Sequence, residues 1–411
     1  MKISENWLRT WVNPAVDSNT LSDQLTMLGL EVDDLSPAAK PFTGVVVGEV
    51  LTVEQHPDAD RLRVTTVNIG SGDSVQIVCG APNVRVGMKA PVATIGAVLP
   101  GDFKIKKGKL RGIESQGMLC GASEIDLEDK IDGLLELPVD APVGTDIREY
   151  LQLDDHVIDI SITPNRGDCF SIRGIAREIG VINQLTVTAP EINAVAATIA
   201  DEKKVVVSTE GCPRYLGRVI KNVNTKAATP EWMERALVRS GIRQHSILVD
   251  ITNYVLMELG QPLHAFDAAK IQGSVQVRQA NMAEKLVLLN EQEVELNEKV
   301  MVIADDEKAL AIAGIMGGLS SSVTDETQEI FLESAFFAPL AIAGRARSFG
   351  LHTDASQRYE RGVDFELPML AMHRASQLIA ELAGGEFGPI TTVEQTAVLP
   401  KREAIELEQA Q

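Results

Sequence analysis

The spacing of apolar residues is helical over the first forty positions and then changes to that of β-strands. A first helix is predicted to begin after Ser4, a residue type that caps helices, and to end before Pro14. A second helix is predicted over 19–28, where leucines recur at helical spacing and Gly29 follows as a C-cap. These two segments indicate a small helical start of the chain.

Short β-branched runs separated by Gly, Pro and Asn follow from Gly44 onward. Five or six such runs within about 80 residues are typical of a small Greek-key barrel such as an OB-fold. The barrel is predicted over residues 40–151. A strand, a Pro-Asn turn and a helix that starts near Asp168 come next.

The remaining chain mixes strands with helices, which predicts a further α+β region. One helix is predicted with Thr229 as N-cap, Pro230 in its first turn, Trp232 on its buried stripe and Gly241 just past its end. Another is predicted over 368–382. The last residues, KREAIELEQAQ, begin like a strand.

Composition narrows the function classes. The 411 residues carry 58 acidic and 38 basic side chains, a net charge of −20, which disfavours a protein that coats nucleic acid with a basic surface. Four scattered cysteines with no CxxC pair indicate a reducing compartment. No secretory signal and no apolar run of membrane-spanning length is apparent, so we expect a cytoplasmic protein without a membrane partner.

Positive charge is nevertheless concentrated inside the predicted barrel. Residues 81–120 hold seven basic and two acidic residues, whereas residues 121–150 hold nine acidic and two basic ones. The segment 81–120 is either an anion-binding surface or a solvated hairpin of alternating lysines, and charge alone leaves both readings open. Its basic residues are Arg85, Lys89, Lys104, Lys106, Lys107, Lys109 and Arg111.

Candidate chemistry lies in the third region. Four polar residues lie beside apolar runs: Arg243, His264, Glu333 and Thr353. The carboxylate of Glu333, which stands between the apolar letters FL and the segment SAFF, needs a polar partner if it is buried. His264 could equally be a satisfied core histidine, and Glu333 could point outward from a strand. The glycine-rich stretch 311–326 is either a backbone-lined pocket or a glycine-rich turn. No HExxH, phosphate-binding loop or GxSxG motif occurs.

Three blocks resemble the tRNA-binding OB-fold that several tRNA-handling proteins carry: HPDADRLRV, IVCGAPN and LRGIESQGMLCGASE. Arg61 and Gly121 depart from the usual lysine and serine of that fold without removing its charge or its turn. The further blocks TPNRGDC, PRYLGRVI, VDITNYVLMELGQPLHAFD, ALAIAGIMGG and GLHTDASQRYERGVD resemble the β-subunit family of bacterial phenylalanyl-tRNA synthetases. The chain is similar to the N-terminal part of that subunit.

The resemblance implies an α+β multidomain fold. It comprises a discontinuous N-terminal α+β domain (1–39 plus 152–190), an inserted OB-fold barrel (40–151), a larger α+β editing domain of the B3/B4 type (205–395), and the truncated start of a further domain (396–411). The barrel would bind tRNA(Phe) through the basic residues of segment 81–120.

The resemblance also implies hydrolysis of tyrosine wrongly attached to tRNA(Phe). His264, Glu333 and Thr353 match catalytic positions, with Glu333 accepting the tyrosine hydroxyl and His264 orienting ester or water. Arg243, Gly317 and Ala355 match substrate-binding positions. No metal is expected in the site, and water attacks the ester.

For the complete enzyme the resemblance implies an α subunit that activates phenylalanine with ATP and magnesium, in an α2β2 assembly. No cofactor is expected for this chain. Two other functions stay open: a noncatalytic tRNA-binding module, which would release no tyrosine, and a free-standing trans-editing deacylase, which a gene ending after codon 411 would favour.

Overall fold

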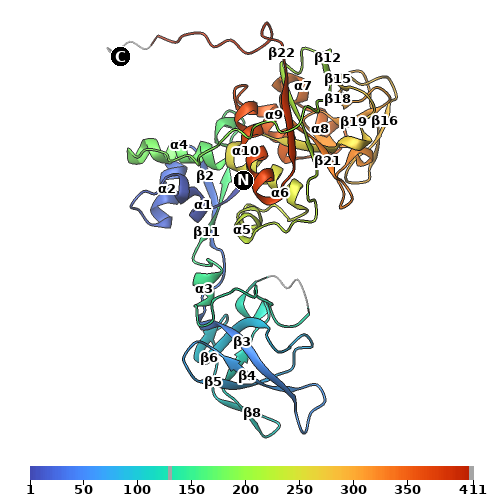
Figure 1. The fold of residues 1–411 in the computed structure, drawn as a ribbon. Coiled ribbons are helices and arrows are strands. Elements are labelled where there is room, and N and C mark those ends of the chain that lie inside the picture. Colours follow the sequence, from blue (N-terminus) through green and yellow to red (C-terminus); the bar gives the residue numbers. More distant parts are fainter. Residues whose placement is uncertain (128–131, 407–411) are drawn as a thin grey trace. The chain divides into compact units, whose positions relative to one another are not determined.

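The computed structural model describes residues 1–127 and 132–406. The chain divides into two compact units, one formed by Met1–Leu35 with Ile158–Gln411 and the other by Ser36–Val157 (Figure 1). Each unit is mixed α and β, which confirms the predicted α+β multidomain class. The OB-fold assignment and the predicted domain boundaries stay predictions.

The chain start forms a small sheet covered by helices. Ser4 caps α1 as predicted, because its hydroxyl accepts a hydrogen bond from the backbone N–H of Trp7 at 3.1 Å. The strand order is β1-β11-β2, so the chain returns to this sheet after the second unit. Its elements and the helices beside them are β1 (Lys2–Ser4), α1 (Glu5–Trp11), α2 (Ser18–Met27), β2 (Glu31–Pro37), β11 (His156–Ser161), η2 (Gly167–Cys169) and α4 (Ile172–Asn183).

The unit Ser36–Val157 is built around a six-stranded antiparallel sheet with the path β10-β6-β3-β4-β5 and β7 on β6. The backbone N–H of Gln116, beside β10, donates to the carbonyl of Gln76 on β5 at 2.8 Å, so the two ends of that path meet. The elements are β3 (Thr43–Gln55), β4 (Arg63–Asn68), β5 (Ser74–Cys79), β6 (Lys89–Leu99), β7 (Phe103–Lys104), β8 (Gly108–Leu110), β9 (Ile113–Ser115), β10 (Gly117–Leu119), η1 (Ser123–Ile125) and α3 (Ile147–Tyr150).

The larger part of the first unit holds two larger sheets and one two-stranded sheet. A four-stranded antiparallel sheet has the order β14-β21-β13-β22, and a five-stranded sheet has the order β12-β15-β18-β19-β20. The strands are β12 (Val205–Val207), β13 (Arg214–Lys221), β14 (Leu263–Asp267), β15 (Val275–Gln279), β16 (Lys285–Val287), β17 (Glu293–Glu295), β18 (Met301–Ala304), β19 (Ala309–Ile312), β20 (Met316–Gly317), β21 (Glu329–Phe336) and β22 (Glu386–Glu394).

Helices cover one face of the four-stranded sheet, where α10 packs on β21 and α6 packs on both α10 and β14 (Figure 1). None of the helices within residues 1–127 and 132–406 is long and apolar enough to cross a membrane. The helices are α5 (Glu231–Arg239), α6 (Ile247–Leu259), η3 (Ala268–Lys270), η4 (Leu319–Ser321), α7 (Pro339–Ile342), α8 (Arg345–Ser348), α9 (Asp354–Arg361) and α10 (Leu367–Leu382).

The two faces of β21 belong to different cores because side chains alternate along a strand. Ile330 and Leu332 pack with the helices, whereas Phe331 and Ala335 pack with residues of the five-stranded sheet. Glu333 shares the face of Phe331 and Ala335. The predicted carboxylate therefore points into the space between the two sheets.

Two local predictions around α5 were wrong. Thr229 does not cap α5, because its hydroxyl donates to the Asp250 carboxylate at 2.6 Å and Pro230 takes the N-cap position without a side-chain bond. Trp232 is 43% exposed and contacts the edge of Tyr254 instead of joining a buried stripe. Gly241 does follow the helix end with a positive φ of 76°, as predicted. Residues 401–406 form no strand, and the rest of the predicted strand lies outside the described residues.

Candidate functional site

The register of the four-stranded sheet brings His264 and Glu333 together. On β14 and β21 these two residues are direct antiparallel partners, although 69 positions separate them in the sequence. Opposed residues of antiparallel strands project from the same face, with Cβ atoms about 5 Å apart. Sequence reasoning grouped these residues by resemblance only, and the strand pairing supplies the geometry.

Both residues line a cavity of about 350 Å³ between β14, β20, β21 and the start of α9. Five of the six predicted catalytic and substrate-binding residues line it: His264, Gly317, Glu333, Thr353 and Ala355. Arg243 does not line it, because it lies exposed in the loop between α5 and α6. The predicted substrate contact of Arg243 stays a prediction.

Glu333 is a buried carboxylate with one neutral partner. Glu333 is 7% exposed, and its Oε2 accepts a hydrogen bond from the Tyr215 hydroxyl at 2.6 Å. Burial raises the pKa of Glu333 to about 7, and the Tyr215 hydrogen bond opposes that rise. The carboxylate therefore titrates near neutral pH.

His264 presents an unused ring nitrogen. Its Nε2 is buried and has no hydrogen-bond partner within the described residues, while its ring stands edge-on to Phe266 with 4.4 Å between centroids. Burial lowers the pKa of His264 to about 4, so the ring is neutral at pH 7. A neutral imidazole with a free nitrogen can accept a hydrogen bond from water or donate one to an ester oxygen.

Gly317 makes room for that ring. A Cβ atom at this position would lie 2.6 Å from Cε1 and 2.7 Å from Nε2 of His264. Any side chain here would push the imidazole away from its present place. The glycine-rich stretch thus includes a wall of the cavity.

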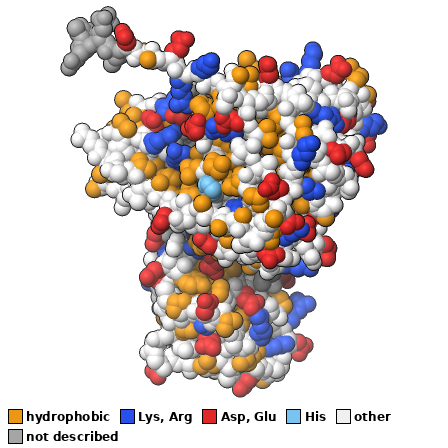
Figure 2. Space-filling model, turned by 45° about the horizontal axis from the view of Figure 1, so that its top comes forward, with side chains coloured by type: hydrophobic (Ala, Val, Ile, Leu, Met, Phe, Trp, Pro, Cys, Tyr) orange, Lys and Arg blue, Asp and Glu red, His pale blue; other side chains and the backbone are white. Residues whose placement is uncertain are grey.

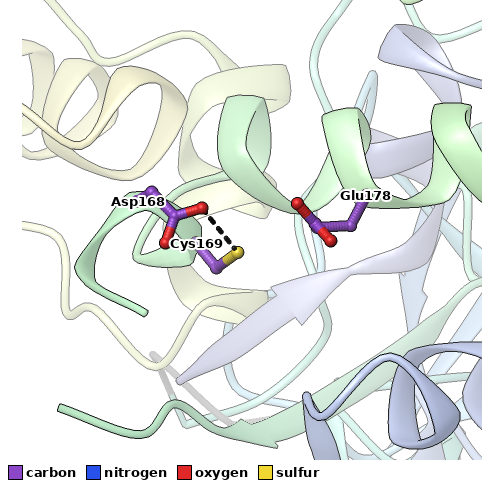
Figure 3. Close-up of side chains that lie close together, drawn as sticks. All are labelled: Asp168, Cys169 and Glu178. Atoms are coloured by element: carbon purple, nitrogen blue, oxygen red, sulfur yellow. Dashed lines mark hydrogen bonds between the residues drawn. The ribbon is translucent and has the colours of Figure 1, made fainter. Parts of the chain in front are cut away.

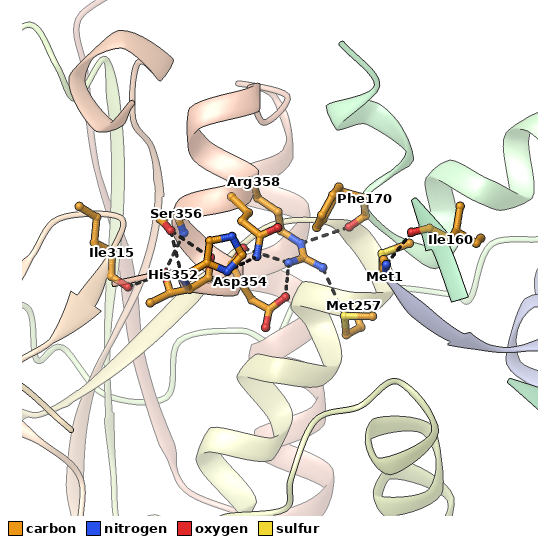
Figure 4. A network of polar contacts seen from close by, with 11 residues as sticks. Met1, Ile160, Phe170, Met257, Ile315, His352, Asp354, Ser356 and Arg358 are labelled. Atoms are coloured by element: carbon orange, nitrogen blue, oxygen red, sulfur yellow. Dashed lines mark hydrogen bonds and ion pairs between the residues drawn. The ribbon is translucent and has the colours of Figure 1, made fainter. Parts of the chain in front are cut away.

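The Thr353 hydroxyl already has two partners at the start of α9. It accepts from the backbone N–H of Ser356 at 3.1 Å and donates to the carbonyl of Ile315 at 2.9 Å. Arg358 anchors the same helix by donating to the carbonyl of Phe170 at 3.1 Å (Figure 4). These bonds fix the start of α9, and the catalytic role of Thr353 implied by the resemblance stays a prediction.

Sequence reasoning missed three polar residues of this region. Thr252 and Asn253 on α6 line the cavity, and Tyr215 on β13 holds Glu333. The pair Thr252-Asn253 interrupts an apolar helix, which is a detectable signal. Tyr215 lies in an ordinary strand, and no local pattern distinguishes it.

The basic segment of the second unit is partly neutralised. Arg85 pairs with Glu136, Lys107 pairs with Glu114 at 2.7 Å, and the Lys89 ammonium donates to the carbonyl of Ala141 at 2.6 Å. Four of the predicted tRNA-binding residues are exposed and form no ion pair within the described residues: Lys104, Lys106, Lys109 and Arg111. The predicted acidic excess over 121–150 falls partly on 128–131, outside the described residues.

An open groove of about 920 Å³ in the same unit is lined by Phe103, Lys104, Lys106 and Ser123 among others. Phe103 is 60% exposed, and the groove that it lines holds two lysines and two carboxylates: Lys104, Lys106, Glu124 and Asp132. On the face that Figure 2 shows, Lys and Arg side chains are interspersed with Asp and Glu.

An arginine side chain contacts all three members of a cluster of possible metal ligands. Asp168, Cys169 and Glu178 bring their ligand atoms within 4.8 Å of one another (Figure 3). The Arg166 guanidinium lies 3.1 Å from Asp168 Oδ1, 2.8 Å from Cys169 Sγ and 2.9 Å from Glu178 Oε1. A cation already satisfies these groups, and the cluster does not fit a magnesium ion.

The two parts of the fold match two family models. Residues 45–146 match a putative tRNA binding domain, and residues 211–384 match the B3/4 domain, which contains His264, Gly317, Glu333 and Thr353. The chain thus combines a match to a putative tRNA binding domain with a match to a B3/4 domain.

Relatives give the particular family. The chain is 80% identical over its whole length to the phenylalanine–tRNA ligase beta subunit of Acinetobacter baylyi, of which it covers 52%. It is 64% identical over 99% of its length to the beta subunit of Psychrobacter arcticus, covering 52%, and 59% identical over 98% to that of Pseudoalteromonas translucida, covering 51%. The chain belongs to the phenylalanine–tRNA ligase beta-subunit family and spans about half the length of these curated relatives.

Proposed function

We propose that this chain binds tRNA through its second unit and hydrolyses tyrosyl-tRNA(Phe) in the cavity of its first unit. The observation that carries the proposal is the direct pairing of His264 with Glu333 in a cavity of about 350 Å³. That volume lies within the range of small-ligand pockets and suits an aminoacyl group.

Glu333 supplies the proposed selectivity. Tyrosine differs from phenylalanine by one hydroxyl, and Glu333 keeps one carboxylate oxygen that accepts no hydrogen bond within the described residues. A hydrogen bond to a charged acceptor contributes roughly 1.5–3 kcal/mol, which corresponds to about 10- to 100-fold in discrimination. A phenylalanyl ester cannot form this bond and would bind more weakly.

His264 supplies the proposed orientation of water. With a pKa of about 4 it is a weak base at pH 7, so its buried Nε2 acts by holding a water or the ester in line rather than by removing a proton completely. Gly317 leaves space for the ring, and Thr353 fixes the start of α9 beside Ala355. Attack of the water on the ester carbonyl releases free tyrosine and deacylated tRNA.

The domain organisation belongs to the same proposal. We assign the N-terminal domain to residues 1–39 and 152–190, the OB-fold to 40–151 and the editing domain to 205–395. In the complete enzyme an α subunit would activate phenylalanine with ATP and magnesium in an α2β2 assembly in the cytoplasm. The hydrolysis itself uses this chain's residues and water.

Single-turnover release of amino acid from tyrosyl-tRNA(Phe) and phenylalanyl-tRNA(Phe) tests the proposal. The chain should release tyrosine at least tenfold faster than phenylalanine. His264→Ala should slow both reactions, and Glu333→Ala should reduce the preference about 10- to 100-fold while tRNA binding persists. A chain that binds tRNA and releases neither amino acid would be a noncatalytic tRNA-binding module, and the proposal would be wrong.

A further inference from the structure

Tyr215 reaches Glu333 diagonally across two strands. On β13 and β21, Gly217 is the direct partner of Glu333, and Tyr215 is the direct partner of Ala335. Diagonal neighbours on one face of a sheet are about 7–8 Å apart, within reach of an aromatic side chain. A Cβ atom at Gly217 would collide with the Phe331 ring, so this glycine makes room for that ring on the face that also carries Glu333.

The Tyr215 hydroxyl holds one oxygen of Glu333 from the side away from the cavity. Tyr215 is fully buried, does not line the cavity, and donates to Glu333 Oε2 at 2.6 Å. The second oxygen, Oε1, accepts no hydrogen bond within the described residues. A donor that enters the cavity would therefore find one oxygen fixed and the other available.

The other groups around Glu333 do not stabilise its charge. Cys212 before β13, His264 on β14 and Tyr359 on α9 are its titratable neighbours, and all three are neutral at pH 7 because burial raises the pKa of the thiol and phenol and lowers that of the imidazole. Burial raises the pKa of Glu333, and the Tyr215 hydrogen bond is the contact that lowers it. Without that bond the carboxyl would hold its proton to a higher pH.

We propose that Tyr215 is the positioning residue of the site: its hydroxyl fixes Glu333 Oε2, so that Oε1 is left to accept the phenolic hydroxyl of the substrate. This inference rests on the proposed function and deepens it. Selectivity for tyrosine then depends on a residue that never touches the substrate. A proton bound to Glu333 would turn the acceptor into a donor and weaken the distinction between the two esters.

The test compares the full chain with Tyr215→Phe, measuring single-turnover release of tyrosine and phenylalanine from pH 6 to 8.5 after subtraction of spontaneous hydrolysis. In the unsubstituted chain the preference for tyrosine should rise with a midpoint near pH 7. In Tyr215→Phe that midpoint should move upward by about one pH unit, because one charge-assisted hydrogen bond corresponds to roughly tenfold. At pH 7 the preference should fall about fivefold, because the ionised fraction of Glu333 drops from about one half to about one tenth, and it should recover at pH 8.5.

Tyr254→Phe is the matched control, because Tyr254 is a buried tyrosine beside Glu258 and Arg374 that does not line the cavity. It should leave the midpoint unchanged. If Tyr215→Phe slows both esters without moving the midpoint, Tyr215 only supports the fold and the inference is overturned. If the unsubstituted chain releases neither amino acid, the proposed function has failed instead.

A second readout does not need activity. The pH dependence of unfolding, compared between Tyr215→Phe and the double variant Tyr215→Phe/Glu333→Gln, reports the titration of Glu333 in the absence of the Tyr215 hydroxyl. Its midpoint should lie about one pH unit above that obtained from the unsubstituted chain and Glu333→Gln. Equal midpoints would refute the role of Tyr215 whatever the catalytic result.

Discussion

Replacing Glu333 with glutamine should stabilise the unit that contains it at alkaline pH. Glutamine has nearly the same shape and keeps a carbonyl oxygen that can accept the Tyr215 hydrogen bond, but it cannot ionise. The substitution therefore removes the cost of a buried negative charge without opening a cavity. A residue retained for selectivity would thus be unfavourable for stability.

The magnitude follows from the shift of the Glu333 pKa from 4.5 to about 7. Between these values the unfolded chain has lost the proton while the folded chain keeps it, so stability falls as pH rises through the folded pKa. At about 1.36 kcal/mol for each pH unit the loss amounts to roughly 3 kcal/mol above pH 7. Glu333→Gln lacks this loss and should be more stable by about that amount at pH 8, with little difference at pH 4.5.

His264 contributes a dependence of opposite sign. Its pKa is lowered from 6.5 to about 4, so stability is lost as pH falls below 6.5, because the unfolded chain takes up a proton that the folded chain does not. Both chains share this contribution, and it cancels when the variant is compared with the unsubstituted chain. The difference between the two therefore isolates Glu333.

Urea unfolding at pH 5 and pH 8, followed by tryptophan fluorescence, measures this difference. The three tryptophans, Trp7, Trp11 and Trp232, all belong to the unit that contains Glu333. Glu329→Gln on the same strand is the control, because Glu329 is the first residue of β21 and its side chain is 42% exposed. A difference between Glu333→Gln and the unsubstituted chain that stays constant from pH 5 to pH 8 would refute the reasoning.

Three further outcomes are expected. Gly317→Ala should slow release of both amino acids by tenfold or more, because the added methyl displaces the His264 ring; unchanged rates in single-turnover assays would contradict this. Thr353→Ala should cost about 1 kcal/mol through loss of the α9 cap, whereas Thr353→Ser should retain it, as thermal unfolding can check. Alanine at the exposed, unpaired lysines should weaken tRNA binding and lower its salt slope by roughly one per lost phosphate contact, whereas Lys107→Ala, whose ammonium pairs with Glu114, should change the slope less. The lysines of that variant are Lys104, Lys106 and Lys109.

Local sequence signals determined much of the secondary structure. Ser4 caps the first helix, Gly241 ends α5, and the run that contains Glu333 is a strand, because capping, positive φ and alternation depend on residues within a few positions of each other. The motif blocks also indicated the family, which the relatives confirm. The prediction for Thr229 was wrong because its hydroxyl donates a hydrogen bond to the carboxylate of Asp250, which is distant in sequence.

The tertiary structure decided how these elements form a site. Pairing of β14 with β21 sets His264 beside Glu333, and pairing of β13 with β21 brings the Tyr215 hydroxyl to the carboxylate from 118 positions away. The tertiary structure also decided which charges are neutralised. Arg166 lies within hydrogen-bonding distance of Asp168, Cys169 and Glu178, and ion pairs neutralise part of the positive charge of segment 81–120. Strand register and burial depend on contacts between distant segments, so no local pattern encodes which polar group meets which partner or how far its pKa moves.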